Sequence, residues 1–137
     1  EITKLAINIF EKNVITIIHP NKPLYHSIDR NQWIRVMTNL IQNAFQSIPS
    51  YRKPQIKITI REKNKEIEIV ISDNGMGIEV ENKNKIFEPR FTTKSGGMGL
   101  GLGIVKKIIQ SLNGEIEFQS KLNKGTDFII KLKKNEI

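Results

Sequence analysis

Residues 66–78 read EIEIVISDNGMGI, an alternating strand pattern that runs directly into an acidic residue and two glycines. Isoleucine recurs at every second position, which is the periodicity of a β-strand with one buried face. Residues 56–60 show the same alternation, and Glu-Lys-Asn-Lys at 62–65 separates the two segments. The pattern predicts a β-hairpin whose second strand ends near Asp73.

Helical and strand patterns alternate along the rest of the chain. Asp29 is a good N-cap for a helix that reaches about Ile48, and the predicted inner face consists of Ile34, Met37, Ile41, Ala44, Phe45 and Ile48. A second helix is predicted for 100–112, with Asn113-Gly114 as its C-cap and an inner face of Ile104, Val105, Ile108, Ile109 and Leu112. The other predicted elements are a short helix at 1–11 and strands at 14–18, 115–120 and 126–133.

This order of elements predicts an α+β fold. We expect a two-layer α/β sandwich with a mixed, mostly antiparallel sheet and helices on one face. Residues 74–97 show no sustained period, and a loop of that length is typical of a functional lid. The 137 residues suit one domain, and because the chain does not begin with methionine we expect a fragment of a longer protein.

Composition narrows the function classes. The chain has no cysteine, which excludes disulfides and thiolate metal sites, and it has no apolar run near the roughly 20 residues that cross a bilayer. The net charge of +8 fits a nucleic acid, an anionic surface or a phosphate-rich ligand as partner, or simply a solvated lysine-rich surface. The lysines are scattered, densest around Lys131, Lys133 and Lys134, and no aromatic stacking platform accompanies them, so we favour the solvated surface.

Asn39 and Asn43 form the first candidate site. Four residues apart on the predicted helix, the two amides lie on one face, beside the apolar stripe. An exposed polar stripe would look the same. The functional interpretation is an Mg²⁺ site, because this cation prefers oxygen ligands.

Asp73 with Gly75, Gly77 and Ile78 forms the second candidate site. Asp-Asn-Gly is also a common hairpin turn, but no alternating strand follows it here. A carboxylate at a strand end suits the exocyclic amine of adenine, and the glycines let the base approach the backbone. Guanine, with an oxygen at that ring position, would be repelled.

The third candidate is the glycine run 96–103, GGMGLGLG, which opens the second helix. Such a run can be a flexible linker. Backbone amides at a helix N-terminus, with glycines that permit close approach, also form a phosphate cradle. The run lacks the Lys-Ser/Thr ending of a P-loop and does not follow a strand. It therefore matches neither a Walker A motif nor a Rossmann dinucleotide-binding motif.

In this order the motifs resemble the Bergerat ATP-binding fold of the GHKL superfamily, which histidine kinases share with type II topoisomerases, mismatch-repair ATPases and a heat-shock chaperone. Residues 38–44 are similar to the N box, 73–78 to the first glycine box, 86–94 to the F box and 97–103 to the second glycine box. The resemblance spans about 29–132.

The resemblance implies a role for each matching position. Asn43 would bind Mg²⁺, and Asp73 would bind the adenine amine in a pocket shaped by Gly75, Gly77 and Ile78. The residues that would hold the phosphates are Lys94, Gly99, Leu100, Gly101 and Leu102. Thr126 would support the adenine site, while Phe87 and Phe91 would anchor the lid. Gln46 replaces a common basic residue, and Arg90 stands where phenylalanine is common.

Asn39 points to one branch of the superfamily. Members that hydrolyse ATP usually have glutamate there, and a carboxylate can act as a general base whereas an amide cannot. A neutral imidazole already has a lone pair, so Asn39 favours transfer to histidine. The expected function is the ATP-binding catalytic domain of a sensor histidine kinase. The rivals are a stand-alone ATPase or switch, and a non-enzymatic docking or nucleic-acid-binding module.

The resemblance also implies partners. The γ-phosphate of Mg-ATP would pass to a histidine on a separate dimerisation domain and then to a response regulator. His19 and His26 do not lie in a helix of the required kind and are expected to be surface residues. We expect a monomeric cytoplasmic domain with little activity alone, no nucleic-acid partner, and a homodimeric parent kinase that is either soluble or anchored in the inner membrane.

Overall fold

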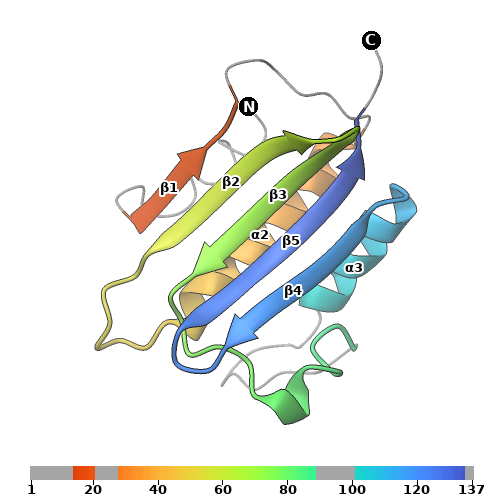
Figure 1. The fold of residues 1–137 in the computed structure, drawn as a ribbon. Helices are drawn as coiled ribbons and strands as arrows, with labels where there is room; N and C mark the ends of the chain where they lie inside the picture. Colours follow the sequence, from red (N-terminus) through yellow and green to blue (C-terminus); the bar gives the residue numbers. More distant parts are fainter. Residues whose placement is uncertain (1–13, 21–27, 89–100, 135–137) are drawn as a thin grey trace.

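One five-stranded sheet organises the molecule. The computed structural model describes residues 14–20, 28–88 and 101–134. Within them the strands lie in the order β1-β2-β3-β5-β4 (Figure 1). β1 pairs parallel to β2, and all the other pairs are antiparallel. The strands are β1 (Ile15–Ile18), β2 (Ile56–Lys63), β3 (Glu66–Asp73), β4 (Glu115–Lys121) and β5 (Gly125–Lys133).

Two helices, α2 (Arg30–Ser47) and α3 (Gly101–Ser111), cover one face of this sheet (Figure 1). Alternate strand residues point toward the helices, as the period of two requires. The most deeply buried side chains come from both layers and include Met37, Leu40, Ile41, Ile58, Ile71, Ile109, Phe128 and Ile130. Each such aliphatic side chain contributes about 1.5–3 kcal/mol by leaving water. The predicted fold class, α+β with a mixed sheet and helices on one face, is confirmed.

Helix α2 begins at the predicted cap. Asp29 Oδ1 accepts hydrogen bonds from the backbone N–H groups of Asn31 (2.8 Å) and Gln32 (3.2 Å). The predicted inner face was incomplete: Ile34 and Phe45 pack half-buried against the core, but Trp33, Val36 and Leu40 were not predicted. The buried set is Trp33, Val36, Met37, Leu40, Ile41 and Ala44. The buried face is wider than one stripe because α2 packs against both the sheet and α3.

Asparagine residues close three of the turns. Asn64, Asn113 and Asn123 have φ of 58°, 57° and 64°, a left-handed conformation that asparagine tolerates. The β2–β3 turn is two residues, Asn64-Lys65, rather than the four predicted, because pairing extends to Lys63 and Glu66. At the end of α3 the left-handed residue is Asn113, and Gly114 N–H bonds to Ile109 O at 3.0 Å.

Several predictions lie outside the described residues. These are the helix at 1–11, His26, Arg90, Phe91, Lys94, Gly99, Leu100 and the second half of the lid. The first half of the lid, 74–88, consists of turns and one short 3₁₀ helix, η2 (Val80–Asn82). Within the described residues, no helix combines the length and hydropathy needed to span a membrane.

The sheet face opposite the helices carries a ladder of alternating charge. Arg61 pairs with Glu68, and the Lys131 ammonium lies 2.6 Å from the Glu117 carboxylate. A further ion pair lies on the helix-covered side of the sheet, where Lys134 is 2.9 Å from Glu62. Two of the three clustered tail lysines therefore have carboxylate partners.

Candidate nucleotide-binding site

Asp73 is the last residue of β3 and is buried, with a 9% exposed fraction. Its Oδ1 accepts hydrogen bonds from Gly75 N–H at 2.8 Å and Thr126 N–H at 3.3 Å. Backbone donors satisfy a buried carboxylate without neutralising it, because N–H groups stabilise the ionised form. The alternating pattern of β3 places Asp73 on the helix-covered face, opposite Thr126 of β5. The structure therefore brings the predicted site residues Asp73 and Thr126 together.

Gly75 and Gly77 allow the turn after β3 to dock closely on two other elements. A methyl group on Gly75 would lie 2.7 Å from Ser47 O, at the end of α2. Gly77 has φ of 78°, and a methyl group there would lie 2.5 Å from Lys121 O. Met76 links both sides, since its N–H donates to Ser47 O at 2.9 Å and its carbonyl accepts from Asn123 N–H at 2.7 Å. The turn is clamped between α2 and the β4–β5 hairpin.

Ser120 joins two of the predicted site residues. Its Oγ accepts from Ile78 N–H at 2.8 Å and lies 2.9 Å from Thr126 Oγ1. It also lies 3.2 Å from Gly125 O. Ile78, Ser120 and Thr126 thus form one hydrogen-bonded group beside Asp73. This arrangement fixes the Thr126 hydroxyl, which sequence reasoning had assigned to the adenine site.

Asn39, Asn43 and Ser47 form a row along one face of α2, because residues four apart lie above one another. At one end Ser47 contacts the turn after β3, as described above. At the other end, a methyl group on Gly101 at the start of α3 would lie 3.6 Å from the Asn39 carboxamide. The row spans roughly 12 Å at 1.5 Å per residue. Half-buried Asn43 lies between the two ends.

Phe87 packs the end of the described lid segment onto the sheet. Its ring makes edge contacts with Phe118 (5.9 Å between centroids) and Phe128 (6.3 Å). The Lys106 ammonium of α3 lies 5.0 Å from the centroid of the same ring. Aromatic pairs of this kind contribute about 0.5–1.5 kcal/mol beyond their burial. The predicted anchoring role of Phe87 is consistent with these contacts, and Leu102 at the start of α3 is half-buried.

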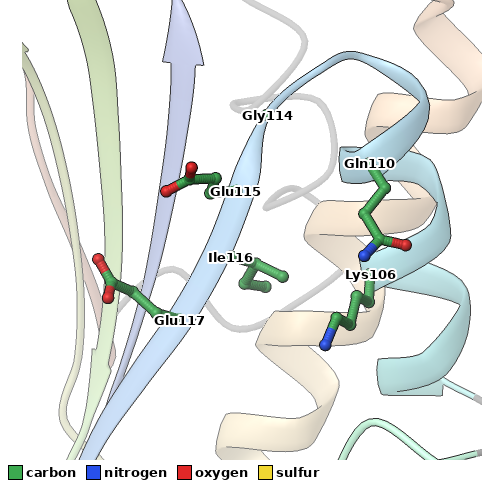
Figure 2. Close-up of a pocket in the computed structure, with 6 residues that line it drawn as sticks. All are labelled: Lys106, Gln110, Gly114, Glu115, Ile116 and Glu117. Atoms are coloured by element: carbon green, nitrogen blue, oxygen red, sulfur yellow. The ribbon is translucent and has the colours of Figure 1, made fainter.

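A surface hollow lies elsewhere, between α3 and β4 (Figure 2). It has a volume of about 350 Å³ and is lined by Lys106, Gln110, Gly114, Glu115, Ile116 and Glu117. None of these was predicted to bind a nucleotide, and its lining lacks the turn after β3. The hydrogen-bonded groups around Asp73, and not this hollow, form the candidate site.

Two acidic side chains follow Ile78 at the beginning of the lid. The pKa of Glu79 is raised by a hydrogen bond with Glu81, by repulsion from the Glu81 charge and by slight burial. Both side chains are exposed, so water screens the interaction. The pair places negative charge near the turn but takes no part in the hydrogen bonds around Asp73.

Sequence reasoning missed two residues that support the turn. Ser120 follows Ile116 and Phe118 on the inward side of β4, and a hydroxyl continuing an apolar face was the available signal. Arg52 lies in the α2–β2 loop, and its Nη1 donates to Asn74 O and Gly75 O. A single arginine in a loop carries no sequence signal of such a role.

His19 is exposed, as expected, and its Nδ1 lies 3.0 Å from Pro20 O.

A buried carboxylate at a strand end, glycines at two close approaches and an amide row leading to a helix start together define a nucleotide-binding α+β domain. Residues 28–136 match the family model described as histidine kinase-, DNA gyrase B- and HSP90-like ATPase. The chain therefore belongs to this ATPase family.

Within the family, the relatives are sensor kinases. The chain is 41% identical over 118 residues to sensor protein SrrB of Staphylococcus aureus, covering 80% of this chain and 20% of SrrB. It is 37% identical over 130 residues to a probable C4-dicarboxylate sensor kinase of Halalkalibacterium halodurans, covering 92% of this chain and 23% of the relative. The chain thus spans about a fifth of the length of these relatives.

The fold matches a solved histidine kinase catalytic domain. The nucleotide-free catalytic domain of histidine kinase ThkA superposes with a TM-score of 0.84 at 31% identity, covering 97% of this chain and 90% of that one. The predicted family, fold and kinase class are confirmed by these likenesses. The chain is a histidine kinase-type, ATP-binding catalytic domain.

Proposed function

We propose that this chain binds Mg-ATP and transfers the γ-phosphate to a histidine on a separate dimerisation domain, from which a response regulator receives it. The observation that carries the proposal is the buried Asp73 carboxylate, held by two backbone N–H groups at the end of β3. Its geometry suits the recognition of an adenine amine. Membership of the family and the sensor-kinase relatives supply the reaction class.

The turn after β3 binds the base. Asp73 accepts a hydrogen bond from the adenine amine, and Gly75 and Gly77 leave room for the ring against the backbone. Thr126, held by Ser120 at 2.9 Å, supports the same edge of the base. A carboxylate repels the exocyclic carbonyl oxygen that guanine carries at the corresponding position, so the site selects adenine.

The Asn39 end of the row formed by Asn39, Asn43 and Ser47 on α2 binds the phosphates. Asn43 supplies an amide oxygen of the type that Mg²⁺ accepts, and its half-buried position on α2 fits that role. Mg²⁺, when bound, neutralises charge on the transferring phosphate. The start of α3 around Gly101 and Leu102 offers backbone N–H groups, with Gly99, Leu100 and Lys94 as further phosphate-binding residues.

Asn39 determines what the phosphate is transferred to. Its carboxamide lies beside the start of α3, next to the proposed phosphates, but an amide does not take a proton from water. The acceptor must therefore bring its own nucleophile with a lone pair, as a neutral imidazole does. Residues in this site orient the nucleotide and leave the nucleophile to the partner domain.

The proposal extends to the parent protein. Residues 1–137 form one catalytic domain of a longer sensor kinase, monomeric by itself and cytoplasmic. The parent is a homodimer through its histidine-containing domain, and it is either soluble or anchored in the inner membrane. Nucleic acid is not a partner.

A transfer assay tests the proposal. The chain is mixed with γ-labelled Mg-ATP and the histidine-containing domain of its parent kinase, alone and together. We expect label on the histidine domain only when both are present, in an acid-labile, base-stable bond. The histidine domain with its histidine replaced by glutamine is the matched control.

The same assay distinguishes the rival function. A stand-alone ATPase would release labelled phosphate without the histidine domain and would leave that domain unlabelled. We expect the reverse, and an Asn39→Glu variant that gained hydrolysis would support the role assigned to the amide.

A further inference from the structure

Arg52 connects the loop after α2 to the turn after β3. Its Nη1 donates hydrogen bonds to the carbonyl oxygens of Asn74 (2.6 Å) and Gly75 (3.0 Å). The residue is half-buried, so its guanidinium is partly withdrawn from water. Hydrogen bonds from a charged donor are roughly twice as strong as neutral ones. One side chain therefore holds two successive peptide groups of the turn.

The same peptide groups are also bonded at their opposite ends. The peptide that offers Asn74 O to Arg52 offers Gly75 N–H to Asp73 Oδ1 at 2.8 Å. The next peptide offers Gly75 O to Arg52 and Met76 N–H to Ser47 O at 2.9 Å. Because a peptide group is planar, fixing its carbonyl direction also fixes its N–H direction.

We propose that Arg52 is a positioning residue for Asp73: through the 74–75 peptide group it aims the Gly75 N–H at the carboxylate and so sets the orientation that adenine requires. This inference rests on the proposed function, in which Asp73 binds the base. Arg52 also polarises the peptide, since a charged donor on the carbonyl strengthens donation by the N–H. No contact between Arg52 and the nucleotide is needed.

A second set of bonds keeps the turn in place independently of Arg52. Gln55 N–H donates to Asn74 Oδ1 and Asn74 Nδ2 donates to Lys53 O, both at 2.9 Å. These bonds tie the turn to the same loop through the Asn74 side chain. Removal of the Arg52 side chain should therefore leave the turn docked but free its peptide groups to rotate.

The test uses Arg52→Ala, Arg52→Lys and the control Arg35→Ala. Arg35 is an exposed arginine of α2, twelve residues before Ser47 and hence roughly 18 Å along the helix from the turn. Calorimetric titrations with Mg-ADP and Mg-IDP give the preference for adenine over hypoxanthine, which carries an oxygen in place of the amine. Amide NMR spectra of protein isotopically labelled at glycine, recorded without nucleotide, report the Gly75 N–H directly.

We expect Arg52→Ala to weaken ADP binding about tenfold and to lower the ADP-to-IDP preference, with the Gly75 amide proton shifted. Arg52→Lys should retain part of the ADP affinity and part of the ADP-to-IDP preference, because an ammonium can reach one carbonyl. Arg35→Ala should change neither. A loss of melting temperature alone does not explain a changed base preference, so this readout separates positioning from bulk stability.

Two results overturn the inference while leaving the site intact. One is an Arg52→Ala variant with unchanged ADP affinity and preference. The other is an equal loss for ADP and IDP, in step with lowered stability and without a Gly75 shift. If the unsubstituted chain binds neither nucleotide, the proposed function itself fails and this inference fails with it.

Discussion

The glycines of the turn after β3 and the glycine at the start of α3 serve different purposes. At Gly75 and Gly77 an added methyl group would lie 2.7 Å from Ser47 O and 2.5 Å from Lys121 O. At Gly101 the nearest atoms would be those of Asn39, 3.6 Å away, which is ordinary van der Waals contact. The fold requires glycine in the first region and tolerates a side chain in the second.

This difference indicates where a ligand is expected to act. Where two backbones approach closely, packing alone accounts for the glycine, and no ligand is needed to explain it. Gly101 has no such explanation, and glycine within a helix costs about 0.5–1 kcal/mol relative to alanine. The absence of a side chain there fits close approach of phosphates to the start of α3. The proposed base-binding end is built by packing, whereas the proposed phosphate-binding end leaves space at Gly101.

The largest effect should come from Gly75→Ala. The methyl group meets the backbone of α2, so the turn must move, and the free energy of unfolding should fall by about 1–3 kcal/mol or more. Ser47→Ala in the same chain removes only the hydroxyl and should not restore stability, because Ser47 O remains. Denaturant unfolding measures this. A loss below about 0.5 kcal/mol would contradict the required packing.

Ser120→Ala should have the next largest effect. It leaves the Ile78 N–H and the Thr126 hydroxyl without their shared partner, which costs about 1–2 kcal/mol of unfolding free energy. ADP affinity should fall severalfold because Thr126 loses its fixed orientation. Exposed Gln119 on the same strand is the control position, as Gln119→Ala. Equal behaviour of the two variants would refute the supporting role of Ser120.

Gly101→Ala should separate binding from stability. The unfolding free energy should stay the same or rise by up to about 1 kcal/mol, because alanine is the better helix former. Affinity for a non-hydrolysable ATP analogue should fall more than affinity for adenosine, since only the former brings phosphates to α3. A drop in stability, or equal losses for both ligands, would erase the contrast between the two regions.

Glu117→Gln should have the smallest effect. Hydrogen bonding to Glu117 and attraction to its charge raise the pKa of Lys131, with further attraction to Glu68 and Glu66 opposing a small burial effect. A raised lysine pKa adds stability below the ordinary lysine pKa, and this is lost as the pH rises through the raised value. The melting temperatures of the variant and of the unsubstituted chain should therefore converge at high pH, with nucleotide binding unchanged. A persistent difference there would exclude the ion pair as its cause.

Local signals in the sequence predicted much of this molecule. The cap at Asp29, the β2–β3 hairpin and the position of Asp73 each depend on residues close together in the chain. The amide pair on α2 was placed correctly beside the apolar face for the same reason. These elements agree with the structure because helix and strand periodicity are set by neighbouring residues.

Long-range contacts account for what the sequence did not reveal. Arg52 bonds to carbonyls 22 and 23 residues away, and Ser120 bonds to an N–H 42 residues away. The inner face of α2 was misjudged because two partners, the sheet and α3, bury a wider arc than one stripe. Glu68 is buried on the open face because Arg61 and Lys131 flank it on the neighbouring strands. No local pattern in the sequence indicates any of these contacts.

The most direct test of the account is a calorimetric titration of the chain and of Asp73→Asn with a non-hydrolysable ATP analogue and Mg²⁺. Asparagine preserves the shape of the side chain but replaces one carboxylate oxygen with an amide donor, which opposes the adenine amine. We predict binding by the unsubstituted chain and a loss of about 100-fold in the variant, with little change in melting temperature. Equal affinity of the two proteins would contradict the assignment of Asp73 as the adenine-binding residue.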